Sequence, residues 1–536
     1  MNTRTFIVGN IKLPLNASSQ EAFSVARKKL KSLEISDSDI KFNIYKQSID
    51  ARDKKDIKLV YSVACEVSDT SISSDKLKLC AITEINRTNP LDFELGTEKM
   101  SAPPLIVGSG PAGLFAALVL AEKGYNPILL ERGGAVQERK AVVERFYKFG
   151  ILDPETNIQF GAGGAGTFSD GKLVTRINDP LSDYVLSRFV EFGAPKEILY
   201  LARPHIGTDI LSEVVDRMLS HITKLGAKVF FNTKYQRSIR QNGLNIAKTT
   251  NGDFQYSSLI LATGHSARDI QEYLIDSGFA VESKNFSVGM RIEHLTESID
   301  RAMFGDFAGH KKLGHAEYNL SHNTKARGVY TFCMCPGGEV VAAASEAGGV
   351  VVNGMSRHAR DGKNSNCAVV CSVFREDYGA TPKKAIEFQR EIERRAFLAA
   401  GSDFSAPALT LGDFFENKSG TNFDKVLPTY MNSSMKVKSV HPNEYLPSFV
   451  TEGIKNALMA FDKKIHGFAD KSAVLTGPET RTSSPIRVLR DNETRTAINN
   501  DSVYPCAEGA GYAGGITSAA IDGIKTAIAV MKKYKP

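Results

Sequence analysis

The chain has 536 residues, of which 42% are hydrophobic and 24% charged, and its formal net charge is +7. This composition is typical of a globular protein with about two to four domains, and the lack of a polybasic block argues against a nucleic-acid partner. No apolar stretch reaches the roughly 18 residues of a membrane helix, and the start of the sequence lacks the apolar region of a signal peptide. Seven scattered cysteines do not form a disulfide framework, so we expect a cytoplasmic protein without membrane insertion.

Residues 1–98 are expected to form a separate small α+β domain. Alternating apolar residues predict strands at Thr5–Ile11, Lys41–Ile49 and Ile57–Val67, and a helix at Ser18–Leu33 lies between the first two. This order of strand, helix, strand and strand suggests a ferredoxin-like sandwich, although no second helix is evident. Because positive and negative charges nearly balance here, we interpret the unit as a docking or capping domain.

A glycine turn follows the linker of residues 99–104. The apolar strand Leu105–Val107 leads into Gly108, Gly110 and Gly113, which open a helix rich in alanine and leucine. Gly108 permits a tight turn, Gly110 lets the backbone approach a pyrophosphate, and Gly113 allows the helix to pack closely on the strand. The start of the helix offers unpaired N–H groups and the positive end of its dipole to phosphates. The segment therefore predicts a dinucleotide site.

The second strand of this unit, Ile128–Leu130, ends at Glu131. A carboxylate at this place accepts hydrogen bonds from the adenosine ribose, so Glu131 is expected to bind the nucleotide. We expect the same site to include Pro111, Ala112 and Arg132.

A second glycine-rich run lies within residues 157–176, where Gly161, Gly163 and Gly166 repeat the spacing of the first. No convincing strand precedes this run and no apolar helix follows it, so it does not predict a second nucleotide-binding unit. Two interpretations stay open: a flexible loop, or backbone pressed against a flat ligand. In the second interpretation the contacts come from Gly163, Gly164, Ser169, Asp170 and Lys172.

The rest of the sequence divides into an insertion and a return to the first fold. The apolar residues before Ala262-Thr263-Gly264 predict a further strand of the same sheet. Residues 281–475 contain short strands, glycine-rich turns and one charged helix, Pro382–Ala400, and are interpreted as a substrate domain. Residues 476–536 end in a strand, a glycine turn and an apolar helix. We therefore expect one α/β nucleotide-binding domain made from residues 99–280 and 476–536.

Several motifs carry a resemblance to a known family. Residues 104–131 have the form of the FAD-binding motif, Ala262-Thr263-Gly264 is similar to a turn of the two-motif flavoproteins, and Glu508–Gly515 resembles the C-terminal flavin motif. Together with four further motifs, they make the chain similar to the bacterial FAD-dependent dehydrogenase-like proteins, often called NAD(FAD)-utilising dehydrogenases. These motifs are F-G-A-G-G-A-G-T-F-S-D-G-K-L (160–173), V-G-M-R-I-E-H (288–294), Y-T-F-C-M-C-P-G-G (330–338) and R-T-S-S-P-I-R (481–487).

This resemblance implies an α/β fold with three parts: a Rossmann-like FAD-binding domain, an inserted α+β substrate domain, and an N-terminal ferredoxin-like α+β domain. It implies one noncovalent FAD and two-electron or hydride transfer at flavin N5. The helix that starts near Ile516 would direct its positive end at the flavin ring. Glu508 stands where many flavoenzymes have aspartate. The implied flavin contacts are Ala262, Thr263, Gly264, Glu508, Gly509, Gly515 and Ile516.

The sequence contains no second strand–glycine–helix unit for a nicotinamide cofactor. This argues against a stable NAD(P)H domain and leaves transient use of NAD(P)H open. Two alternatives to an oxidoreductase acting on a small molecule also stay open. One is a flavin-dependent RNA-modifying enzyme with the N-terminal domain as RNA reader, and the other is a non-catalytic FAD-binding electron carrier.

Cys333 and Cys335 stand two residues apart in an extended run, so their side chains are expected on one face of a strand. Such a pair can bind a metal or serve as a redox thiol. However, no other pair has zinc-finger spacing, and Cys367 and Cys371 lack matching histidines. We therefore predict no metal site and favour buried structural thiols, with Cys335 as a weak catalytic candidate.

His294 is the best single candidate for proton transfer, because it follows Arg291 and Glu293 in a strand-like run. His265 comes directly after the Ala-Thr-Gly turn and is expected to contact cofactor or backbone. Three arginines precede the last flavin motif and are either solvated or an anion clamp for a carboxylate or phosphate. These are Arg481, Arg487 and Arg490.

Overall fold

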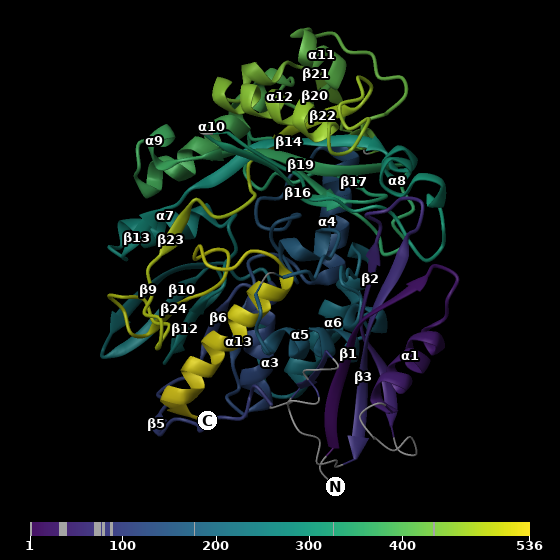
Figure 1. Ribbon diagram of the computed structural model, residues 1–536. Helices are drawn as coiled ribbons and strands as arrows, with labels where there is room; N and C mark the ends of the chain where they lie inside the picture. The colour runs from purple at the N-terminus through teal and green to yellow at the C-terminus, as the bar shows by residue number, and fades with distance from the viewer. Residues whose placement is uncertain are drawn as a thin grey trace.

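The computed structural model describes residues 3–31, 40–68, 77, 81–85, 89–175, 177–324, 326–432 and 435–536. Within these ranges the three largest sheets have four, five and seven strands. Figure 1 shows the seven-stranded sheet at the top, the five-stranded sheet with its helices below it, and the N-terminal unit at the lower right. No helix in the described ranges is long and apolar enough to cross a bilayer.

A parallel sheet unites strands from distant parts of the chain. Its members are β6 (Leu105–Val107), β7 (Ile128–Leu130), β8 (Lys228–Phe230), β12 (Leu259–Leu261) and β24 (Val503–Pro505). They are ordered β24-β12-β6-β7-β8, and every neighbouring pair is parallel. Parallel strands are normally buried on both faces, which explains the short, wholly apolar runs of β6 and β12. The late strand β24 thus extends a sheet that begins near residue 105.

Helices α3 (Pro111–Glu122) and α13 (Ile516–Lys533) pack against each other on this sheet. A Cβ atom on Gly523 would lie 2.1 Å from the carbonyl oxygen of Ala112, so the helices cross at close range. Figure 1 shows α13, in yellow, alongside α3. The remaining elements of this half are α4 (Val136–Phe149), η1 (Ala165–Phe168), α5 (Leu181–Glu191), η2 (Lys196–Leu199), α6 (Thr208–Lys224), β9 (Tyr235–Gln241), β10 (Leu244–Thr249), β11 (Gly252–Tyr256), α7 (Arg268–Asp276), β5 (Glu98–Lys99) and β25 (Tyr534–Lys535).

The N-terminal unit is an antiparallel sheet with one described helix. Its elements are β1 (Thr3–Pro14), α1 (Ser19–Lys31), β2 (Lys41–Asp50), β3 (Lys58–Ser68) and β4 (Ile82–Ile85). The strands are ordered β2-β3-β1-β4, and the predicted order of strand, helix, strand and strand is observed. Residues 32–39 and 69–76, where the predicted first helix ends and a second helix would fall, lie outside the described residues.

The seven-stranded sheet is ordered β15-β16-β19-β14-β22-β20-β21. Its strands are β14 (Phe286–Leu295), β15 (Ser321–Asn323), β16 (Gly328–Cys335), β19 (Asn364–Val373), β20 (Ala406–Thr410), β21 (Val437–Ser439) and β22 (Val474–Glu479). Helix α12 (Ser448–Asp462) covers one face, and the hairpin of β17 (Glu339–Ala342) and β18 (Val352–Met355) covers the other. The prediction of short strands was wrong for β14 and β19, because strands buried on both faces show no alternation.

Two predicted domain boundaries cut through strand pairings. The boundary after residue 475 falls inside β22, which pairs with β14 as far as Glu479. The strand β13 (Val281–Ser283), placed in the insertion, pairs with β23 (Ile486–Val488) near the C-terminal flavin motif. Strand pairs between distant segments leave no compositional signal at a boundary.

The remaining elements are α8 (Thr296–Phe304), η3 (Gly305–Phe307), α9 (Arg375–Tyr378), α10 (Pro382–Ala399), α11 (Leu411–Glu416), η4 (Thr429–Asn432) and η5 (Pro442–Glu444).

Candidate functional site

The first glycine turn has the close contacts that its spacing predicts. Gly108 has φ 101°, and a Cβ atom there would lie 2.3 Å from the carbonyl oxygen of Ala262. A Cβ atom on Gly113 would lie 1.8 Å from the carbonyl oxygen of Gly108. A Cβ atom on Gly110, in contrast, has its nearest neighbour at 3.9 Å, the Cα atom of Gly164. The fold itself therefore requires two of these glycines, whereas a Cβ atom at the third would make only an ordinary van der Waals contact.

The start of α3 fits the phosphates of a dinucleotide. Gly110 occupies the capping position in an extended conformation, no side chain caps the helix, and Pro111 follows at its first turn. Proline has no N–H, and the next amides, from Ala112 onward, point out of the helix start. A helix start with free amides beside glycines has the geometry and the dipole that favour an anion.

Glu131 lies directly after β7 with 4% of its surface exposed, and its carboxylate already has four donors. Oε2 accepts from the amide and hydroxyl of Ser109 at 2.9 and 2.7 Å. Oε1 accepts from the amides of Gly133 and Gly161 at 3.0 and 2.9 Å. A carboxylate has about four acceptor positions, so a ribose hydroxyl would have to replace one of these donors. Arg132, predicted beside it, instead forms ion pairs with Glu155 and Asp269.

The second glycine-rich run is held by a buried arginine that the sequence did not single out. Arg139 of α4 is 1% exposed. Its Nε donates to the carbonyl of Asn157 at 2.9 Å, and its Nη1 donates to those of Ala162 and Gly164 at 2.7 and 2.9 Å. Burial lowers the pKa of Arg139 to about 10. This loop has a defined structure, and a lone arginine within a charged helix gives no signal that it fixes one.

The polar residues after this run have partners within the protein. The Ser169 hydroxyl donates to the carbonyl of Gly166 at 2.7 Å. Asp170 is 1% exposed and pairs with Arg360, whose Nε lies 3.0 Å away. Lys172 donates through Nζ to the carbonyl of Met334. Asp170 and Ser169 thus serve the loop, and Lys172 links it to the end of β16.

The C-terminal motif meets the other motifs at two points. A Cβ atom on Gly509 would lie 2.8 Å from the amide nitrogen of Gly264, within the predicted Ala-Thr-Gly turn. A Cβ atom on Gly166 would lie 3.1 Å from Cγ1 of Ile516, at the start of α13. This helix also has no side-chain cap, and Gly515 precedes it with φ 89°. The structure therefore brings the four motifs, which span some 400 positions of sequence, into contact around two open helix starts.

Glu508 is a half-buried carboxylate beside this junction. Its Oε1 accepts from the amide of Ser484 at 2.8 Å. Among the described residues no donor bonds its second oxygen, which lies 2.4 Å from the position that a Cβ atom on Gly514 would take. Burial raises the pKa of Glu508 above its usual value.

His294 lies away from these motifs. In β14 it takes the face opposite Arg291, and its Nε2 lies 2.8 Å from the carbonyl oxygen of Phe468. Its ring packs on that of Phe468, and burial lowers its pKa. The interpretation of His294 as a proton donor or acceptor at the flavin is not favoured by this position. His265 is buried near Arg481, where burial and that charge lower its pKa to about 4.

The three predicted clamp arginines do not act together. Arg481 is bound to Glu393 at 3.0 Å, together with Arg268, in a fully buried cluster. Although burial opposes ionisation, the two guanidinium groups hold the pKa of Glu393 well below its usual range. Arg490 is bound to Asp522 of α13 at 2.8 Å. The anion clamp is therefore wrong for these two side chains, because each has its own carboxylate.

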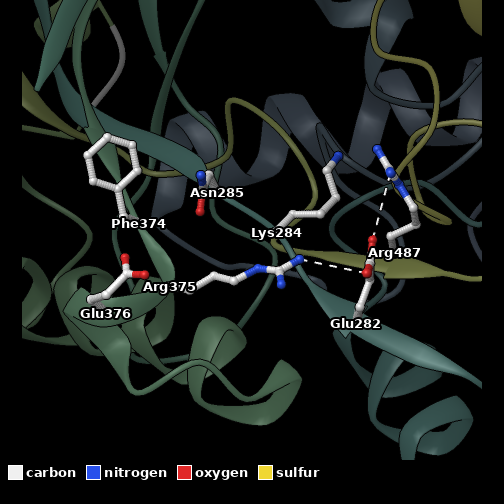
Figure 2. A pocket seen from close by; sticks show the side chains of 7 residues that line it. All are labelled: Glu282, Lys284, Asn285, Phe374, Arg375, Glu376 and Arg487. Carbon is white, nitrogen blue, oxygen red and sulfur yellow. Dashed lines mark ion pairs between the residues drawn. The ribbon is translucent and has the colours of Figure 1, made fainter.

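The third of these arginines lines an open pocket of about 560 Å³ beside the C-terminal motif. Figure 2 shows Arg375 and Arg487 reaching Glu282 from opposite sides, with Lys284 between them. Each guanidinium lies 3.7 Å from that one carboxylate. The Lys284 ammonium donates to the carbonyl of Gly511 at 2.9 Å, and burial lowers its pKa. Three cations and two carboxylates thus line one hollow, which leaves a net excess of one positive charge. The lining residues are Glu282, Lys284, Asn285, Phe374, Arg375, Glu376 and Arg487.

Comparison with protein families defines the class of this protein. Residues 285–482 match the family "FAD-dependent protein, C-terminal domain-like", and residues 8–66 match "Domain of unknown function (DUF8436)". The first match covers all seven strands of the seven-stranded sheet. The protein is an FAD-dependent protein, and its cofactor is FAD.

A full-length relative identifies the family more closely. The chain is 44% identical over 528 residues to an uncharacterized protein of Clostridium beijerinckii (strain ATCC 51743 / NCIMB 8052). The alignment covers 97% of this chain and 98% of the relative. The chain belongs to the same family as that clostridial protein.

Solved flavoprotein structures share only a distant likeness. CtdE in complex with FAD is 12% identical, with a TM-score of 0.31 over 81% of this chain and 84% of that one. The flavin-dependent monooxygenase PieE, in complex with FAD and substrate, is 12% identical, with a TM-score of 0.35 over 80% of this chain and 58% of that one. At these scores neither structure carries an argument about the reaction.

Proposed function

We propose that the protein is an FAD-dependent oxidoreductase that transfers two electrons, as a hydride, at N5 of a noncovalently bound flavin. The single observation that carries this proposal is the open start of α13, which meets Gly166 and, through Thr517, the carbonyl of Leu173 at 2.8 Å. Bound FAD supplies the hydride chemistry itself. The positive end of α13 would stabilise the negative charge of a reduced ring without reorganisation.

The proposed binding mode uses the rest of the junction. The start of α3 and the backbone of Gly110 and Gly164 would hold the pyrophosphate, and Glu508 would accept from a ribityl hydroxyl. Glu131 would accept from the ribose after exchanging one of its four donors. In this arrangement the parallel sheet, with α3 and α13, acts as a Rossmann-like domain, and the seven-stranded sheet provides the substrate side.

The pocket of Lys284, Arg375 and Arg487 supports an anionic reductant. It lies beside Gly511 of the C-terminal flavin motif, and its cations would bind the phosphates of a nicotinamide nucleotide or the carboxylate of a metabolite. NADH and NADPH are therefore the first reductants to consider, used transiently and without a domain of their own.

Anaerobic reduction of the purified protein tests this function. Flavin absorbance is followed against a panel of small reductants that begins with NADH and NADPH. Bleaching by one of them with saturation kinetics is the expected result. Reduction only by a protein partner would favour an electron carrier instead, and salt-sensitive tRNA binding would favour an RNA-modifying enzyme. A colourless protein that takes up no flavin on reconstitution would overturn the proposal.

A further inference from the structure

Cys333 and Cys335 are held in an unusual conformation at the end of β16. The strand pairs regularly with β19 as far as Phe332, and the register then shifts before Cys335. Cys333 has φ 46°, in the left-handed region that residues other than glycine rarely adopt. Consequently the Sγ atom of Cys335 turns back to 3.4 Å from the carbonyl oxygen of Cys333.

This irregularity matters for the chemistry open to the pair. In a regular strand, Cα atoms two residues apart are separated by about 6.6 Å, at the long limit of disulfide geometry. The turn at Cys333 interrupts the regular strand, and it brings the sulfur of Cys335 back against the backbone of Cys333. Backbone in a strained conformation is kept where the surrounding structure fixes it, and such sites are often functional.

Two cations from different elements lie beside Cys333. Arg291 of β14 donates through Nη1 to the Cys333 carbonyl at 3.1 Å, and Lys172 donates to the next carbonyl, that of Met334. The neighbouring Cys335 thiol lowers the pKa of the Cys333 thiol most, and the Arg291 and Lys172 charges lower it further, while burial and the Asp170 charge oppose this shift. The pKa of Cys335 is raised. One thiol is thus set up as the nucleophile and the other holds the proton.

The other cysteines provide an internal contrast. Of the six described cysteines, Cys333 is the one that is not fully buried. Cys367 and Cys371 lie in the regular strand β19, where burial raises their pKa to about 12 and about 11. In the described part of the chain, no group of three His, Cys, Asp or Glu side chains could hold a metal ion. A metal site therefore does not account for the Cys333–Cys335 pair.

The Cys333–Cys335 pair is linked through Lys172 and Leu173 to the start of α13, where the flavin ring is proposed to bind. Lys172, which contacts Met334, is followed by Leu173, whose carbonyl accepts from Thr517 at 2.8 Å in the first turn of α13. We propose that Cys333 and Cys335 form a redox-active dithiol that exchanges electrons with the flavin. Oxidation joins the two Sγ atoms in one bond and releases two electrons and two protons, which convert FAD to FADH2. This inference rests on the proposed function, and it assigns a thiol or disulfide as the second redox partner of the protein.

The decisive experiment is an anaerobic reductive titration of the full-length, FAD-loaded, air-oxidised protein with dithionite. The wild type is expected to take up two equivalents per flavin, one for the disulfide and one for FAD. Cys333→Ser and Cys335→Ser should each take up one equivalent. Cys371→Ser is the matched control, because it removes a buried thiol from the neighbouring strand, and it should behave as the wild type.

Alkylation of thiols gives a readout that does not depend on activity. The tryptic peptide of residues 328–357 contains both cysteines and no other. From oxidised protein it should be lighter by two hydrogen atoms and unreactive to iodoacetamide, and after titration it should carry two labels. This measurement on the wild type shows whether Cys333 and Cys335 form a disulfide, even if a serine variant fails to fold.

The outcomes separate the two proposals. A yellow protein that takes up one equivalent and whose peptide is always doubly alkylated overturns the dithiol and leaves the flavin function standing. A protein that binds no FAD overturns both. A disulfide that forms in the peptide but stays oxidised when the flavin is fully reduced also contradicts the proposed exchange.

Discussion

The two glycine-rich segments, residues 108–113 and 161–166, share the spacing Gly-x-Gly-x-x-Gly but are fixed in different ways. In the first, an added Cβ atom meets backbone of the sheet and of the same turn, as Gly113 does against Gly108 at 1.8 Å. In the second segment, an added Cβ atom meets side chains of other elements. A Cβ atom on Gly161 would lie 2.5 Å from Cδ of Arg139, and one on Gly166 would lie 3.1 Å from Cγ1 of Ile516.

The difference teaches what such a pattern can and cannot specify. The first segment lies between a strand and a helix, so local geometry alone explains its glycines. The second has no strand before it and only the short η1 after it, and its form depends on Arg139. The segments touch where a Cβ atom on Gly164 would lie 2.9 Å from Cα of Gly110. The same spacing therefore occurs in two touching segments, of which only the first is fixed by its local structure.

The largest effect is expected at Gly113. Gly113→Ala forces a Cβ atom against backbone, and we expect the free energy of unfolding to fall by more than about 4 kcal/mol, measured by urea denaturation. The Cβ atom of Gly110→Glu comes no closer to protein than 3.9 Å, an ordinary contact with Cα of Gly164, so this variant should leave the unfolding transition almost unchanged while abolishing FAD retention on gel filtration. A yellow, fully loaded Gly110→Glu protein would contradict the placement of the pyrophosphate.

Removing the arginine tests the second segment. Arg139→Met should lower the free energy of unfolding by about 3 kcal/mol, because it leaves several buried carbonyl groups without a donor. It should also weaken FAD binding, measured by equilibrium fluorescence, since the loop against α3 loses its support. Lys140→Met, an exposed neighbour on the same helix, is the matched control. If Arg139→Met and Lys140→Met bind FAD equally well, the loop does not depend on Arg139.

The anchor of α13 gives a smaller, pH-dependent effect. Burial opposes ionisation of Asp522, but Arg490 and Arg495 lower its pKa to about 2 from 3.8. A carboxylate with a lowered pKa stabilises the fold above its unfolded pKa, and this stabilisation is lost as the pH falls toward the folded value. Compared with Asp522→Asn, the wild type should therefore lose about 2 kcal/mol between about pH 5 and pH 2. Parallel pH profiles of the two proteins would exclude this role.

The smallest effect is expected outside both segments, in the pocket of Figure 2. Arg487→Gln and Arg375→Gln should each raise the KM of an anionic reductant about tenfold, which corresponds to one charge-assisted hydrogen bond, with FAD retention unchanged. Steady-state kinetics at low and high salt provide the measurement. Arg394→Gln, exposed on α10, serves as control. An unchanged KM in both pocket variants would remove the pocket from the reaction path.

Local patterns were enough to predict many elements of the fold. The strand, turn and helix from Leu105 to Glu122, the late strand β24 and the helix α13 all lie where the sequence places them. Each is a short apolar run beside glycines, and such runs are determined by neighbours along the chain. The fold of the middle region was harder, because β14 and β19 are covered on both faces and show no period.

The sequence by itself determined the glycine positions, the open helix starts and the resemblance to FAD-dependent proteins, because these depend on residues within one turn of each other. Only the tertiary structure decided which charges meet: Arg139 with the second loop, Arg481 with Glu393, and Lys172 with the end of β16. It also decided that His294 contacts the carbonyl of Phe468 and that the Cys335 thiol turns back to the Cys333 carbonyl. Tertiary packing determines which side chains far apart in sequence come into contact, and local residue spacing does not predict these contacts.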